Sequence, residues 1–503
     1  METRNYIAGE WREATGGRTY PTFNPTTGAV IADVARSSPA DVDAAVAAAR
    51  QALPAWKATP APLRANLLFQ VATVAQARED ELVQYICQEH GKSQEDAHGD
   101  IQELIHVALY WAGEGRRQYG SIIPSEKRAK LGFSRREPLG VVVALTPWNF
   151  AVTKPALKIF AALVFGNTVV HKPAHETPLI GTMIQELVNE AGIPAGVVNT
   201  VLGLSDEIGD RLVEHPDVGL ITYTGTTPVG RSIAARAGER LTPVSLELTA
   251  KNALIVNDDA NLDLALDWAV LSAFATNGQR ETAASRIILH RAIADEFTAR
   301  FLERVDRLRV GDPLDAATRI GPLISAEQRA AIEDYVQRSV AAGGQVLCGG
   351  RRPADPGLAN GYFYEPTVIA GIDPLSPLAM EEVLGPVTMF FPVASLDEAI
   401  DIANATPFGL SMSIFTSSIE TGLATAERFE SGVAWINAGT VGAEVGLPFG
   451  GAKATGIGTT EWGQGAVDTF TRWKTTYINY GGSLRMVFED TRLQVETAGK
   501  APA

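Results

Sequence analysis

Three polar residues stand where side chains can do chemistry. Glu281 lies in "NGQRETAASR", between an apolar helical pattern and the strand-like run "RIILH", a position typical of a catalytic nucleophile. Glu247 interrupts the apolar run "PVSLELTAKN", and Asn149 follows a strand-like run in "TPWNF". A desolvated carboxylate has a raised pKa, which suits a general base. An amide at a strand end can hold an oxyanion.

Both Glu247 and Asn149 also have structural explanations. Glu247 can pair with Lys251 at the start of the next segment, and Asn149 can cap the helix that follows it. The residue types alone do not decide between the two roles.

Two further features indicate a nucleotide site. "TGTTPVG" (224–230) follows a strand-like run and opens a helical one, so its backbone N–H groups can meet a pyrophosphate. Lys172 ends the run "NTVVHKP" and can reach a ribose or a phosphate. Open α/β sheets bind ligands at the carboxyl ends of their strands. Taken one at a time, a plain strand-to-helix turn and a solvated lysine are the simpler explanations.

These residues need a sheet to bring them together, and the sequence predicts one. Residues 38–110 are helical in pattern. From about residue 139, β-branched runs alternate with helical stretches, which predicts a parallel sheet covered on both faces. A second αβ series starts at "NALIVN" and includes a helix predicted over 261–276. The polar insert 117–138 has no local core, so we expect it to pack on another subunit.

Composition narrows the class of protein. The chain has 503 residues, which favours two to four domains, and a net charge of −15, which disfavours nucleic acid or an anionic membrane as partner. Two distant cysteines and scattered histidines fit neither a disulfide framework nor a metal site. The start resembles no leader, and no apolar window is long enough to span a membrane. We therefore expect a cytoplasmic protein.

Eight motifs, in order, carry a resemblance to a known family: "TPWNF", "KPAHETP", "YTGTTPVG", "LELTAKN", "NGQRETAASR", "EEVLGPV", "PFGLSMSIFT" and "LPFGGAKATGIG". Together they resemble the aldehyde dehydrogenase superfamily over almost the whole chain. "GQR" and "GAEVGLPFGGAKATG" look most like the branch that oxidises carboxylated semialdehydes such as α-ketoglutarate semialdehyde.

The resemblance implies an α/β aldehyde dehydrogenase fold with three parts. The Rossmann-like dinucleotide-binding domain would comprise residues 1–116 and 139–248, and the α/β catalytic domain residues 249–446. A β oligomerisation arm, residues 117–138 and 467–484, would add strands to a neighbour's sheet and give a homodimer or homotetramer.

The family chemistry uses a cysteine that attacks the aldehyde, a hydride transfer to the nicotinamide, and a glutamate-activated water that hydrolyses the thioester. By resemblance, Asn149 matches the oxyanion-hole residue, Glu247 the general base, and Glu281 aligns with the nucleophilic cysteine. The residues that match cofactor-binding positions are Trp148, Lys172, His175, Gly225, Thr226, Gly230, Leu248 and Glu382.

Several departures surround the nucleophile position. Glu281 can form no thioester, and Cys87 and Cys348 lie outside every active-site motif. Thr249 and Ala250 replace two glycines, which predicts a shifted nicotinamide ring or a narrower pocket. His175 stands where a glutamate favours NAD. Because histidine does not repel a 2′-phosphate, we favour NADP, with NAD as the alternative.

Three hypotheses follow. The first is an NAD(P)-dependent oxidoreductase that transfers hydride, without a covalent intermediate, to or from a small carbonyl or imine substrate. Glu281 would be its acid/base, with one of the paired carboxylates Glu281 and Glu247 raised in pKa by the other. The second is a semialdehyde dehydrogenase inactivated by a Cys-to-Glu change. The third is a pseudoenzyme that keeps the fold without catalysis.

Overall fold

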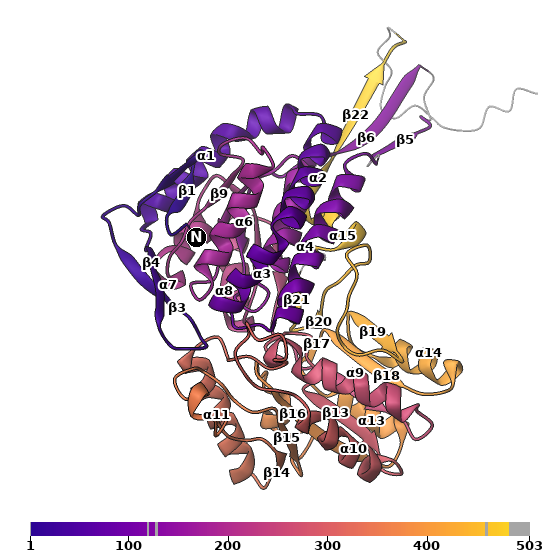
Figure 1. Ribbon diagram of the computed structural model, residues 1–503. Helices are drawn as coiled ribbons and strands as arrows, with labels where there is room; N and C mark the ends of the chain where they lie inside the picture. The colour runs from indigo at the N-terminus through magenta and orange to yellow at the C-terminus, as the bar shows by residue number, and fades with distance from the viewer. Residues whose placement is uncertain (1, 118–119, 126–128, 458–460, 482–503) are drawn as a thin grey trace, which may run out of the picture. The chain divides into compact units, whose positions relative to one another are not determined.

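The computed structural model describes residues 2–117, 120–125, 129–457 and 461–481. The chain divides into two units (Figure 1). The first comprises Met1–Arg117 and Pro138–Thr471, and the second Gln118–Glu137 and Arg472–Ala503. In the described part of the chain, no helix is both long and apolar enough to cross a membrane.

The N-terminal sheet of the first unit has eight strands in the order β2-β1-β9-β8-β7-β10-β11-β21. The five central strands, in the order β9-β8-β7-β10-β11, are parallel to one another. The flanking strands β1 and β21 pair antiparallel with β9 and β11. The strands are β1 Asn5–Ile7, β2 Glu10–Arg12, β7 Val141–Leu145, β8 Thr168–Lys172, β9 Val198–Thr200, β10 Val218–Thr224, β11 Val244–Glu247 and β21 Gly456–Ile457.

Both faces of this sheet are buried, as the unbroken β-branched runs predict. In β7, Val142 and Ala144 join one hydrophobic cluster, while Val141 and Val143 join another on the opposite face. The helices of this half are α1 Pro39–Ala58, α2 Ala61–Ala77, α3 Glu79–Glu89, α4 Gln94–Glu114, α5 Thr153–Val164, α6 Pro178–Glu190, α7 Ser205–Glu214, α8 Thr227–Glu239 and α15 Gly463–Phe470.

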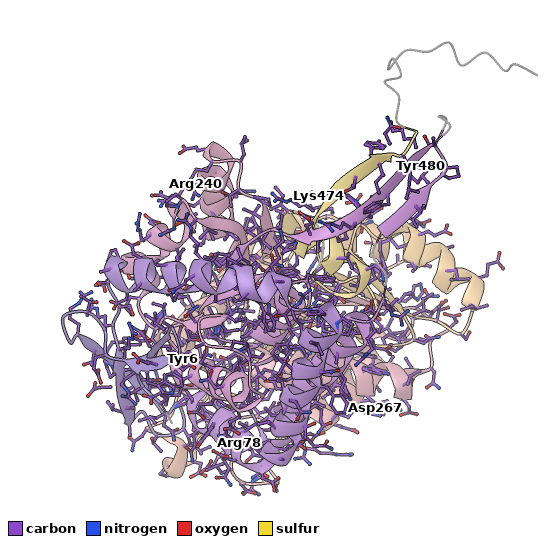
Figure 2. All side chains as sticks on the ribbon, turned by 90° about the horizontal axis from the view of Figure 1, so that it is seen from above. Tyr6, Arg78, Arg240, Asp267, Lys474 and Tyr480 are labelled. Atoms are coloured by element: carbon purple, nitrogen blue, oxygen red, sulfur yellow. The ribbon has the colours of Figure 1, made fainter. Side chains whose placement is uncertain are left out.

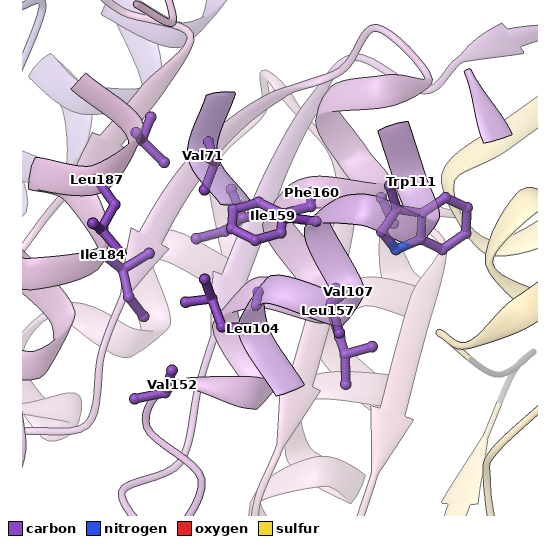
Figure 3. Packing of buried hydrophobic residues seen from close by; sticks show 14 of the residues in the cluster. Val71, Leu104, Val107, Trp111, Val152, Leu157, Ile159, Phe160, Ile184 and Leu187 are labelled. Carbon is purple, nitrogen blue, oxygen red and sulfur yellow. The ribbon is translucent and has the colours of Figure 1, made fainter. Parts of the chain in front are cut away.

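Helix α5 is buried along its whole length, so no solvent-facing stripe interrupts its packing. Leu157, Ile159 and Phe160 of α5 pack with Leu104 and Trp111 of α4 in one cluster (Figure 3). This packing fixes the first turn of α5, which leads directly from "TPWNF". The side chains of that turn therefore have little freedom to move.

A second sheet has seven strands in the order β14-β15-β16-β13-β12-β18-β19, all parallel except β14. Its strands are β12 Ala253–Val256, β13 Arg286–His290, β14 Gln345–Cys348, β15 Thr367–Ala370, β16 Val387–Val393, β18 Ser411–Phe415 and β19 Val433–Ile436. Its helices are α9 Leu262–Phe274, α10 Ala294–Asp306, α11 Ala326–Ala341, α12 Pro377–Met380, α13 Leu396–Asn404 and α14 Ile419–Arg428, with 3-10 turns η1 Ala275–Gly278 and η2 Pro356–Leu358.

Two small hairpins complete the first unit. They pair β3 Thr19–Phe23 with β4 Val30–Ala35, and β17 Phe408–Gly409 with β20 Ala452–Lys453.

The second unit is a three-stranded sheet in the order β22-β6-β5, made of β22 Thr471–Asn479, β6 Lys130–Pro138 and β5 Gly120–Ile123. Lys474 lies on β22, and Tyr480 follows its end (Figure 2). The described part of this unit exposes large apolar side chains, namely Ile122, Ile123, Leu131, Trp473, Tyr477, Ile478 and Tyr480. The predicted arm, 117–138 and 467–484, also contains residues 118–119, 126–128 and 482–484, which lie outside the described residues.

Candidate active site

The segment before Glu281 is a left-handed turn. The helix predicted over 261–276 ends at Phe274, because Thr276 and Asn277 have φ values of 56° and 57°. The Asn277 side chain holds this turn through bonds to the carbonyls of Gly91 and Pro322 and to the N–H of Gly321. Strained backbone of this kind persists only where its surroundings hold it.

Gly278 continues the turn with a φ of 67°, and a Cβ there would lie 2.1 Å from the carbonyl oxygen of Gly385. Beyond it, the Asn252 side chain donates hydrogen bonds to the carbonyls of Glu281 and Ala283, at 2.7 and 3.0 Å. The backbone of Glu281 is therefore held by contacts of the residues before and after it, independently of the bonds that its side chain makes.

Both carboxylate oxygens of Glu281 accept hydrogen bonds. Asn149 Nδ2 donates to Oε2 at 2.9 Å, and Lys154 Nζ lies 3.1 Å from Oε1. Asn149 is 5% exposed, and its own oxygen accepts the N–H of Phe150. The amide predicted to hold an oxyanion thus holds the carboxylate of Glu281 in this structure.

Glu247 ends β11 and is bonded on one oxygen only. Lys154 Nζ donates to Oε2 at 2.6 Å and Thr224 Oγ1 donates to the same atom at 3.0 Å. Oε1 is buried and has no hydrogen-bond partner among the described residues. The register of β10 and β11 explains the Thr224 contact, because it places Thr224 directly beside Glu247.

The prediction of a raised pKa for Glu247 is wrong. Burial does raise the pKa, but the ammonium groups of Lys154 and Lys158 and the hydrogen bonds from Lys154 and Thr224 outweigh burial and lower it. The alternative partner, Lys251, is also incorrect, since the ion pair forms with Lys154.

Lys154 was missed in the sequence, although it connects the two carboxylates. It lies in the first turn of α5, its side chain is 4% exposed, and its Nζ contacts both Glu247 and Glu281. Burial lowers the pKa of Lys154, but these two carboxylates outweigh burial and raise it. The signal was present: "TKPALKIFAALV" places Lys154 and Lys158 four residues apart, on one side of an otherwise apolar helix.

Lys158, one turn further along α5, has a separate partner. Its Nζ contacts Glu461 Oε2 at 2.5 Å and Thr222 Oγ1 at 2.8 Å, and both charged side chains are almost fully buried. The two lysines of α5 therefore form ion pairs with different carboxylates: Lys154 with Glu247 and Glu281, and Lys158 with Glu461.

A larger cavity of about 470 Å³ lies at the carboxyl ends of β7, β8 and β10. Most of the residues predicted to bind a cofactor line it: Trp148, Lys172, His175, Gly225, Thr226, Leu248 and Glu382, together with Asn149 and Glu281. Gly230 does not. It is buried under Leu248, where an added Cβ would lie 2.4 Å from Leu248 Cδ2.

Three of the residues that line the larger cavity are titratable: Lys172, His175 and Glu382. Lys172 is buried, which lowers its pKa to about 8, and its Nζ donates to the carbonyl of Pro173. His175 is exposed and lies 3.2 Å from Glu176 Oε2. Burial raises the pKa of Glu382 to about 7, against a hydrogen bond from the Ala250 N–H.

The substituted positions Thr249 and Ala250 have distinct surroundings. Thr249 lines the larger cavity, and its Oγ1 accepts the N–H of Thr227 at the start of α8. Ala250 is buried and donates its N–H to Glu382. Whether Thr249 displaces a nicotinamide ring stays a prediction.

These residues fit a nicotinamide dinucleotide. The N-terminus of α8, a lysine and a carboxylate line one cavity, and Gly225 lies beside Tyr223, where an added Cβ would lie 2.2 Å from Tyr223 Oη. Lys172 and Glu382 could hold the two riboses, and such a cofactor would supply or accept a hydride beside Glu281.

A smaller cavity of about 250 Å³ lies on the other side of Glu281. It is lined by aromatic rings and by charged side chains, among them Asp100, Glu103, Phe150, Lys154, Arg280 and Phe449. Glu281 lines both cavities. A molecule in the smaller cavity would therefore meet a molecule in the larger one at this carboxylate.

Neither cysteine takes part in this arrangement. Cys87 is buried in α3 and Cys348 lies on β14, and neither lines either of the two cavities. Burial raises the pKa of both thiols, to about 12 and about 11. Within the described ranges, no group of three or more His, Cys, Asp or Glu side chains is placed to hold a metal ion.

Known proteins resemble the chain over nearly its full length. The aldehyde dehydrogenase family matches residues 11–476. The chain is 37% identical over 475 residues to alpha-ketoglutaric semialdehyde dehydrogenase of Bacillus subtilis (strain 168), covering 94% of this chain and 97% of that protein.

Solved structures agree. A putative aldehyde dehydrogenase from Burkholderia cenocepacia is 39% identical with a TM-score of 0.94, covering 97% of this chain and 100% of that one. Betaine aldehyde dehydrogenase from Staphylococcus aureus, in complex with NAD+, is 32% identical with a TM-score of 0.94, and the match covers 97% of each chain.

Proposed function

The chain belongs to the aldehyde dehydrogenase family and is an oxidoreductase of that NAD(P)-dependent type, and from this premise we propose that it transfers hydride without a covalent intermediate. Glu281 stands in place of the family's nucleophilic cysteine. It is the acid/base for a small carbonyl or imine substrate in the smaller cavity.

One observation carries this proposal: Glu281 lines both cavities, while neither cysteine lines either of them. Thioester chemistry needs a sulfur at the meeting point of substrate and cofactor. A carboxylate there can instead exchange a proton with the atom bonded to the reacting carbon.

The proposed reaction balances without a nucleophile. In the reducing direction, a bound nicotinamide would supply hydride for the carbonyl or imine carbon, and the oxygen or nitrogen takes a proton from Glu281. Asn149 positions this carboxyl group through its amide N–H. In the oxidising direction, Glu281 receives the proton instead.

For the cofactor we propose NADP, with NAD as the alternative. Lys172 and His175 line the larger cavity, and neither repels a 2′-phosphate. The roles proposed for the other lining residues are contacts to the dinucleotide by Trp148, Gly225, Thr226, Leu248 and Glu382. Gly230 supports the site by letting α8 pack against Leu248.

The test is Glu281→Gln. Purified protein should oxidise NADPH in the presence of a panel of small aldehydes, ketones and imines, and the variant should lose at least ~100-fold in kcat, the usual contribution of general acid–base catalysis. Glu427→Gln, an exposed carboxylate far along the sequence on α14, is the matched control. Full activity in Glu281→Gln would rule out the acid/base role.

A second candidate is a semialdehyde dehydrogenase inactivated by a Cys-to-Glu change. It is favoured by the 37% identity to a semialdehyde dehydrogenase. Glu281→Cys should then form NAD(P)H with semialdehydes and give a burst of acyl-enzyme. Absence of any gain across several semialdehydes would exclude this candidate.

The subunit organisation also stays a proposal. We propose the three-part division given above, with the described second unit as the oligomerisation arm of a cytoplasmic homodimer or homotetramer. The exposed apolar side chains of β5 and β22 support this role. Light scattering on the purified protein should give a mass of two or four chains.

A further inference from the structure

Lys154 has no part in the function proposed so far, although it forms ion pairs with both Glu247 and Glu281. It lines the smaller cavity, and its ammonium lies between Glu247 Oε2 at 2.6 Å and Glu281 Oε1 at 3.1 Å. The ring of Phe449 lies 5.0 Å from the same nitrogen. A buried lysine in this position needs a reason beyond packing, since an apolar residue would fill the space without desolvating a charge.

Glu281 needs a proton source before it can act as an acid. In the structure both of its oxygens are acceptors, one for the Asn149 amide and one for Lys154. An amide N–H does not give up its proton at ordinary pH. Among the described residues, Lys154 is the one ammonium or guanidinium group recorded within ion-pair distance of Glu281.

Glu247 makes Lys154 a charged donor. Burial alone would lower the pKa of this lysine, but two carboxylates share one ammonium and together raise that pKa, which favours the charged form. Glu247 has no thioester to hydrolyse in a chain without the nucleophilic cysteine. Its hydrogen bonds are consistent with a different task, that of counter-ion to Lys154.

We propose that Lys154 is the proton store of the reaction, a positioning residue that acts through Glu281 and is held charged by Glu247. This inference rests on the proposed function. A bound nicotinamide would supply the hydride. As negative charge develops on the substrate oxygen, Glu281 passes on a proton that Lys154 Nζ delivers in the same step, so the carboxylate is ionised before and after the reaction, and solvent then reprotonates Lys154. The sum is one hydride and one proton added across the double bond.

The proposal narrows the substrate class. A neutral carbonyl takes up both hydride and proton, so its reduction depends on the store. A cationic iminium takes up hydride alone and becomes a neutral amine, so its reduction does not. The presence of a charged store favours a neutral carbonyl as the physiological substrate.

The first test compares Lys154→Ala, Lys154→Arg and, as control, Lys57→Met at an exposed lysine of α1. With benzaldehyde and cyclohexanone, Lys154→Ala should lose about 100-fold in kcat with little change in KM or NADPH affinity, and methylammonium should restore at least 10-fold. With N-methyl-3,4-dihydroisoquinolinium it should stay within 3-fold of the unchanged protein. Lys154→Arg should keep an intermediate kcat.

Equal loss with the carbonyls and the iminium would show a structural role and overturn the proposal, as would unchanged carbonyl reduction. A second test needs no turnover. Lys154→Ala leaves two carboxylates facing an empty site, so methylammonium should raise its Tm. It should not raise the Tm of Lys154→Ala/Glu247→Gln/Glu281→Gln.

If methylammonium does not raise the Tm of Lys154→Ala, the two carboxylates do not form a site for an ammonium group, and the proposal is overturned. The outcomes separate the two proposals, because failure of the proposed function appears as absence of NADPH oxidation in the unchanged protein, whatever methylammonium does.

Discussion

The two cavities that meet at Glu281 differ in how far their residues follow the family motifs. Most of the larger cavity is lined by residues that the motifs identify, at the carboxyl ends of parallel strands and at the N-terminus of α8. The smaller cavity holds charged side chains, Asp100, Glu103 and Lys154 among them, that lie outside those motifs. Cofactor sites depend on backbone geometry, whereas the reaction depends on a few side chains that can change without altering the fold.

The largest expected effect is that of Gly278→Ala, in the turn that leads to Glu281, the residue that lines both cavities. The added Cβ meets the Gly385 carbonyl at 2.1 Å in a left-handed turn, and we expect a loss of about 4 kcal/mol in the free energy of unfolding from backbone strain and overpacking together. Chemical denaturation measures it.

Gly343→Ala is the control, because Gly343 also has positive φ but nothing within 4 Å of an added Cβ. It should lose only about 1–2 kcal/mol. Equal losses in the two variants would show that the turn before Glu281 is not held by its contacts.

Of the two lysines of α5, Lys154 lines the smaller cavity, whereas we expect Lys158 to contribute to stability through its buried ion pair with Glu461. Lys158→Met leaves Glu461 buried without its ammonium partner, and we expect a loss of ~3 kcal/mol in the free energy of unfolding. Lys158→Met/Glu461→Met should recover part of this stability. A single variant as stable as the unchanged protein would mean that the pair contributes nothing to folding.

The pH dependence of NADPH affinity tests the proposed role of Lys172 in the larger cavity. Burial lowers its pKa to about 8, so the ammonium is charged below that pH and neutral above it. NADPH affinity should therefore fall about 10-fold between pH 7 and pH 9.5, since a neutral lysine no longer attracts the 2′-phosphate. Fluorescence titration measures this fall, and NADH should show less of it. A fall of the same size for both cofactors, or one that persists in Lys172→Met, would contradict the assignment.

Thr249 gives the smallest expected effect. Thr249→Val keeps the shape of the side chain but leaves the Thr227 N–H without its acceptor, which should lower the free energy of unfolding by ~1 kcal/mol. Thr249→Ser keeps the hydroxyl and should retain this contribution. A difference below the error of thermal denaturation would show that water replaces the bond.

The sequence predicted the elements better than the electrostatics. The βα alternation predicted a sheet buried on both faces, and the α/β fold is confirmed. The helix predicted over 261–276 began one residue before α9 and ran two residues past its end, where Thr276 and Asn277 take left-handed conformations. The sign of the Glu247 pKa shift was wrong because its partner lies 93 residues earlier in the chain.

The sequence by itself determined the family, the order of the elements and the presence of a glutamate at position 281. These follow from local patterns, in which strand periodicity and turn residues act over a few positions. Only the tertiary structure decided what surrounds that glutamate: Asn149 on one oxygen, Lys154 on the other, and a cavity on each side. The reason is physical, since the charge state of a buried carboxylate depends on groups a few ångströms away in space, which the fold brings from distant parts of the chain.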